Sequence, residues 1–158
     1  MTWYELKKNI YYWDGSLRDI YVLHANQTDW RKWIDYVNEH YLIDWFNGKT
    51  GKNCNNIDFN TIEAYWNGMH TLSSLAKVFI NKTQINAHFF DDMEIENDID
   101  PRDFNSIENH DQLIKYLVEL SILLDKEVIL TPENEKETIL IKIYKNDIQF
   151  YSTYPVMQ

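Results

Sequence analysis

The chain has 158 residues, of which 44% are hydrophobic and 15% aromatic, and its formal net charge is −10 at pH 7. A chain of this length forms a single domain, residues 1–158, whose core needs neither metal nor disulfide, and its few glycines and prolines exclude a disordered or collagen-like chain. The acidic balance excludes nucleic acid and membranes as expected partners and favours a basic protein. One cysteine, Cys54, and no apolar leader or long apolar run predict a bacterial, cytoplasmic protein.

The first part of the chain predicts a β-hairpin and then a helix. In residues 9–25, β-forming side chains flank Asp14-Gly15, a dipeptide that favours the tight turn between two strands. Residues 28–40 predict a helix with Thr28 as its N-cap. Apolar side chains of this segment recur at the spacing of one helical face: Trp30, Trp33, Ile34 and Val37.

The middle of the chain predicts strands. Residues 41–46 and 61–66 each have the composition of a strand. Residues 47–56 lie between them and contain several Asn and Gly, which predicts an exposed loop. Residues 76–90 predict a hairpin that turns at Asn81-Lys82.

The last part of the chain predicts a long helix and further strands. Residues 106–125 form the clearest helical segment, capped by Asn105 or Ser106. Its apolar stripe consists of Leu113, Leu117, Leu120 and Leu124. Two or three strands follow, within residues 127–132 and 138–153. The whole order predicts an α+β fold, with a mostly antiparallel sheet and two principal helices packed on it.

The segment 93–101, MEIENDIDP, has an acidic residue at every second position: Glu94, Glu96, Asp98 and Asp100. On a strand ended by Pro101, these carboxylates share one face, while apolar side chains occupy the other. We expect the four carboxylates to face solvent in a row and to form part of a surface for a basic partner. The alternative is an ordinary half-exposed strand, which shows the same alternation.

A metal site is not predicted for these carboxylates. The calcium-loop pattern needs a glycine and a distal Glu, whereas Arg102 follows this segment. A strand also spaces residues of one face about 6.6 Å apart, too far for all four side chains to reach one ion. Arg18 and Arg102 are instead candidates for structural ion pairs with Asp98 or Asp100.

The sequence contains no catalytic or nucleotide-binding motif, so we predict no catalytic residue and no cofactor. His88 shares a predicted strand face with Asn86 and Phe90, which makes it a candidate general base if a pocket lies beside it. The alternative is a histidine that is simply hydrogen-bonded within the sheet.

In size, acidity, lack of catalytic motifs and α+β pattern, the chain resembles the small acidic cytoplasmic immunity proteins of bacterial polymorphic toxin systems. Its segments YYWDGSLRDIYVL and EIENDIDPRDF also look like the signature of an uncharacterised bacterial family. The first resemblance implies tight inhibition of a cognate toxin through an acidic surface, without catalysis. Two other functions stay open: an enzyme or small-ligand binder that uses His88 with the strand carboxylates, and a scaffold or self-associating domain.

Overall fold

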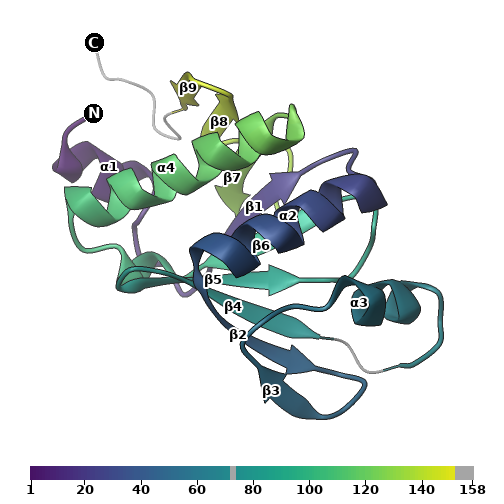
Figure 1. The fold of residues 1–158 in the computed structure, drawn as a ribbon. Helices are drawn as coiled ribbons and strands as arrows, with labels where there is room; N and C mark the ends of the chain where they lie inside the picture. The colour runs from purple at the N-terminus through teal and green to yellow at the C-terminus, as the bar shows by residue number, and fades with distance from the viewer. Residues whose placement is uncertain (72–73, 152–158) are drawn as a thin grey trace.

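The computed structural model describes residues 1–71 and 74–151, which form one antiparallel sheet of nine strands with helices packed on it (Figure 1). The strand order is β3-β2-β4-β5-β6-β1-β7-β8-β9, and all neighbours are antiparallel. The strands are β1 (Arg18–Val22), β2 (Leu42–Asn47), β3 (Lys52–Cys54), β4 (Leu75–Ile80), β5 (Thr83–His88), β6 (Ile95–Ile99), β7 (Val128–Pro132), β8 (Ile141–Tyr144) and β9 (Asp147–Phe150). The predicted α+β class and antiparallel sheet are confirmed.

The described part of the chain has four α-helices, where two principal helices were predicted. They are α1 (Trp3–Asn9), α2 (Gln27–His40), α3 (Phe59–Trp66) and α4 (Ile107–Leu124), and a short 3-10 helix, η1 (Pro101–Asp103), follows β6. The helices α2 and α4 lie side by side over one face of the sheet (Figure 1). All four α-helices contribute side chains to the same buried core, among them Leu6, Trp33, Ile62 and Leu117.

A chain of hydrogen bonds crosses this core and joins both long helices to the sheet. The indole Nε1 of Trp33 donates to the hydroxyl of Tyr116 at 2.9 Å, and that hydroxyl donates to Oδ1 of Asn97 at 2.7 Å. Because all three side chains are fully buried, the bonds compensate for the loss of water and fix α2, α4 and β6 relative to one another.

Alternation along each strand separates two faces of the sheet. Ile20 and Val22 belong to the core under the helices, whereas Asp19 and Tyr21 point to the opposite face. We call this opposite face the open face, because the helices of the described chain pack on the other one (Figure 1). The connection between β7 and β8, residues 133–140, lies against part of the open face.

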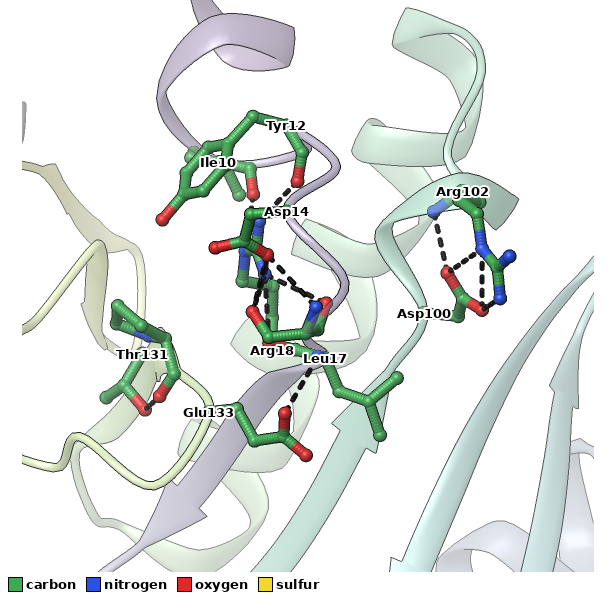
Figure 2. Close-up of polar contacts among 11 residues, drawn as sticks. Ile10, Tyr12, Asp14, Leu17, Arg18, Asp100, Arg102, Thr131 and Glu133 are labelled. Atoms are coloured by element: carbon green, nitrogen blue, oxygen red, sulfur yellow. Dashed lines mark hydrogen bonds and ion pairs between the residues drawn. The ribbon is translucent and has the colours of Figure 1, made fainter.

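The predicted hairpin around Asp14-Gly15 is wrong, because its first strand does not exist. Residues 3–9 form α1, which starts with a capping box between Thr2 and Glu5. The segment that follows bends around the guanidinium of Arg18, which is fully buried (Figure 2). That guanidinium donates to four backbone carbonyls: those of Ile10, Tyr12, Ser16 and Leu17. The buried guanidinium needs hydrogen-bond acceptors, and the backbone bends to provide them instead of forming the predicted hairpin.

The predicted strand at 61–66 is also wrong, since these residues belong to α3. Asp58 caps this helix by accepting hydrogen bonds from the backbone N–H and the hydroxyl of Thr61. Phe59, Ile62 and Trp66 then fall at i, i+3 and i+7 and contact the core on one helical face. The aromatic and β-branched composition of this segment favoured a strand. The hydrogen bonds of the Asp58 cap stabilise a helix instead.

The other predicted elements are confirmed with small shifts. The helix α2 is capped by Asn26, two residues before the predicted Thr28, and α4 is capped by Ser106. The hairpin of β4 and β5 turns at Asn81, whose φ is +53°. The predicted loop 47–56 also contains the short strand β3, and the predicted last strand extends into residues 152–153, outside the described chain.

We expect that replacing Leu117 with Ala lowers the free energy of unfolding by about 2–5 kcal/mol, because the side chain is 1% exposed and its loss leaves a cavity. Chemical denaturation of both proteins measures this difference. A loss below about 1 kcal/mol would contradict the packing of α4 on the sheet.

Replacing Arg18 with Met should lower the free energy of unfolding by about 3 kcal/mol or more, because buried carbonyls then lose their donor. The matched control is Arg31→Met on α2, an exposed arginine over the ring of Phe59, for which we expect less than about 1 kcal/mol. Similar losses for the two variants in urea denaturation would show that Arg18 does not organise its segment.

Candidate functional site

The open face carries a group of ionisable side chains on three adjacent strands. Asp19 lies opposite Asp98 where β1 pairs with β6, and Tyr21 lies opposite Glu96. His88 on β5 is the partner of Glu96 on the other side of β6. We call these five residues the open-face cluster, and side chains of directly opposite residues are close enough to interact.

Asp98 is the acceptor at the centre of this cluster. Its Oδ2 lies 2.5 Å from Nε2 of His88, and its Oδ1 accepts from Nδ2 of Asn86 at 2.8 Å. Burial disfavours the charged form of His88, but the hydrogen bond and attraction from Asp98 outweigh it and raise the pKa of His88. The imidazole also stacks on the ring of Phe90, with centroids 5.0 Å apart. The contact with Asp98 therefore favours the protonated form of His88.

Asp19 ties the connection 133–140 to the sheet. Its Oδ2 accepts from the hydroxyl of Tyr21 at 2.9 Å and from the backbone N–H of Asn134 at 2.8 Å. Burial raises the pKa of Asp19, and repulsion from Asp98 and Glu133 adds to this effect. One carboxylate thus fixes both the Tyr21 ring and the backbone of the connection.

A hollow of about 390 Å³ lies between the connection and the open face. We call it the acidic hollow, and it is lined by Tyr21, Phe90, Glu94, Glu96, Asn134, Lys136 and Glu137. Three carboxylates and one ammonium give this lining an excess of negative charge. Burial raises the pKa of Glu96, and the nearby charge of Asp19 acts in the same direction.

The four carboxylates of the predicted row have different surroundings. Glu94 and Glu96 are half-buried and line the acidic hollow. The expectation that Asp98 faces solvent is wrong, because this residue is 7% exposed and bonded to His88 and Asn86. Asp100 lies beyond the end of β6, where it caps η1. The row therefore divides between the hollow, a buried position on the open face and a helix cap.

One of the two predicted arginine ion pairs is present. Arg102 pairs with Asp100 at 2.7 Å, as Figure 2 shows, and its guanidinium lies over the ring of Trp13. Arg18 pairs with neither Asp98 nor Asp100, and its carboxylate contact is with Asp14 at 3.5 Å. Both arginines thus bond groups of nearby chain segments, and neither lines the acidic hollow.

His88 has the contacts of a sheet histidine, since Nε2 is bonded to Asp98 and its ring lies on Phe90. Within residues 1–71 and 74–151, no group of three or more His, Cys, Asp or Glu side chains is placed to hold a metal ion. None of the helices in these ranges has the length and apolar character that a membrane crossing requires. Comparison of the chain with family models, curated proteins and solved structures gives no match.

Sequence reasoning missed several residues of the site: Asp19, Tyr21, Asn134, Lys136 and Glu137. The alternation of polar and apolar residues in RDIYV was a usable signal for Asp19 and Tyr21. The segment ENEKETIL, which supplies the other three, has no periodicity that distinguishes it from any charged loop. The pairing of β1 with β6 joins residues about 80 positions apart, and local patterns carry no signal for it.

We expect the His88–Asp98 pair to make stability depend on pH. Because the pKa of His88 is raised in the folded state, its stabilisation is full below the unfolded pKa of about 6.5 and is lost as the pH rises through the folded value. The difference in free energy of unfolding between the wild type and His88→Gln should therefore be largest below about pH 6 and shrink at alkaline pH. Urea denaturation across this range measures it.

The same pair is tested directly by NMR titration of His88. Asp98→Asn should lower the pKa of His88 relative to the wild type, because burial then acts without the compensating carboxylate. An unchanged pKa would show that Asp98 is not its partner in solution.

Proposed function

We propose that the chain is a non-catalytic binding protein whose acidic hollow receives a basic segment of a protein partner. The observation that carries the proposal is the composition of the hollow. Its lining contains three carboxylates, two aromatic rings and Lys136 as the single cation. Carboxylates and aromatic faces together are the surroundings that lysine and arginine side chains favour in interfaces.

Apolar side chains beside the hollow support the same proposal. Phe90 is 60% exposed and Met93 is 68% exposed. Phe90 also lines a second hollow of about 450 Å³, on whose rim Asp91 and Asp92 add negative charge. Exposed apolar side chains next to charged ones are typical of binding surfaces, since the apolar groups supply affinity and the charges orient a partner of opposite charge.

The net charge of −10 makes a basic partner the natural one, because the field of the whole chain attracts it and speeds the encounter. The same features fit an immunity protein that neutralises a basic cognate toxin by covering its surface. Under this proposal, the open-face cluster provides the fixed framework on which Glu96 and Phe90 are presented.

A labelled hexa-arginine peptide tests the electrostatic part of this proposal by fluorescence anisotropy. We expect salt-sensitive binding to the wild type, and a several-fold slower association with the double variant Glu96→Gln/Glu137→Gln, since loss of charge reduces steering. The matched control is Asp35→Asn/Glu39→Gln, which removes two exposed charges from α2, on the opposite face of the sheet. A hexaglutamate peptide should not bind.

Equal association of both double variants across salt concentrations would place the interface elsewhere. The toxin-neutralising role is tested separately, by expressing the protein encoded directly beside this chain in bacterial cells, with and without the chain. Restored growth with the wild type, and weaker restoration with Glu96→Gln/Glu137→Gln, is the expected result. Growth that does not depend on this chain would contradict the immunity role.

A further inference from the structure

Lys136 differs from the other residues of the acidic hollow because its charge already neutralises part of the site. Its Nζ donates to both carboxylate oxygens of Glu94, at 2.9 and 2.7 Å. The same ammonium lies 4.9 Å from the centroid of the Tyr21 ring. Lys136 thus makes the ion pair and the cation–π contact that a basic side chain of a partner would make in this hollow.

The hydrogen bond to Glu94 raises the pKa of Lys136, and the charges of Glu96 and Asp91 reinforce it. These residues come from β6 and from the turn before it, whereas Lys136 comes from the connection 133–140. The acids that act most strongly on Lys136 therefore belong to another part of the chain.

We infer that Lys136 is an internal substitute for a basic side chain of the partner, which displaces it on binding. This inference rests on the proposed function and specifies how the acidic hollow is occupied. In the free protein, Lys136 neutralises Glu94 and covers the Tyr21 ring. In the complex, a lysine or arginine of the partner takes that position, and Lys136 turns out to solvent.

The exchange requires only a side chain to move. Lys136 is 43% exposed, and an ion pair at that exposure is weak and readily broken. The backbone of the connection stays in place, because Asn134 remains bonded to the buried carboxylate of Asp19. The hollow thus keeps its shape while its cation is replaced.

Arginine suits the vacated position better than lysine. Its planar guanidinium can bond two carboxylates at once and stack on an aromatic face, whereas an ammonium acts as a point charge. Two carboxylates, Glu94 and Glu96, and two aromatic rings, Tyr21 and Phe90, line the hollow. We therefore expect hexa-arginine to bind more tightly than hexalysine.

The test compares Lys136→Met with Lys145→Met. Lys145 is a close match, since its ammonium lies 3.0 Å from a carboxylate oxygen of Asp125 and 5.2 Å from the ring centroid of Tyr144, away from the hollow. Both variants lose one positive charge. If Lys136 competes with the partner, Lys136→Met should bind hexa-arginine about two- to fivefold more tightly than Lys145→Met, the range expected for loss of one exposed competing pair.

Lys136→Arg keeps an internal cation of the kind that suits this position better, so it should bind hexa-arginine no more tightly than the wild type. Thermal melting of each variant verifies that it is folded. Two results together would overturn the role of Lys136 and leave the proposed function standing. They are equal affinities of Lys136→Met and Lys145→Met for hexa-arginine, and weakened binding of the peptide by Glu96→Gln/Glu137→Gln. Absence of hexa-arginine binding to the wild type at any salt concentration would overturn both.

Discussion

The fold depends on one strand that pairs on both sides. The strands β2 to β6 are contiguous in the chain, as are β7 to β9, and the two groups join only where β1 lies between β6 and β7. Without β1 there would be two smaller sheets with separate edges. Arg18, the first residue of β1, is buried, and the chain before it is shaped to satisfy its guanidinium. A single buried cation thus fixes where the central connecting strand begins.

The strand β1 also determines the positions of the residues in the candidate site. Asp19 and Tyr21 belong to β1, Glu96 and Asp98 to β6, and Lys136 to a connection that is anchored on Asp19. On the other face, Asn97 is bonded to Tyr116 of α4 and is therefore held by the helices. The strand β6 is constrained from both sides, so Glu96 is presented by a rigid support rather than by a loop, which favours a preformed binding surface.

The sequence was sufficient to predict the elements with strong local signals. The stripes of α2 and α4 and the hairpin of β4 and β5 follow from periodicity and turn chemistry, and these are confirmed. It failed where a side chain that bonds the nearby backbone decides the conformation. The carbonyls around Arg18 and the cap formed by Asp58 outweigh the local preference for strands in the two segments concerned.

The acidic row illustrates the same limit within the site. Alternation correctly places Glu96 and Asp98 on one face of β6, but it carries no information on what covers them. Whether a carboxylate is wet or buried depends on His88, on Asn86 and on a connection some 40 residues further along. Those neighbours are set by strand order, which no local pattern specifies.

The adjacent charges Arg18 and Asp19 also have a consequence for folding. Both residues are buried, on opposite faces of β1, and each has its own set of hydrogen bonds. If β1 slipped by one residue against β6, its two faces would be exchanged. The carboxylate of Asp19 would then lie under the helices, and the guanidinium of Arg18 would lie on the open face. Both ions would then be desolvated without partners. Misaligned pairings of the connecting strand are therefore strongly penalised, and this pair of opposite charges acts as a check on strand alignment during folding.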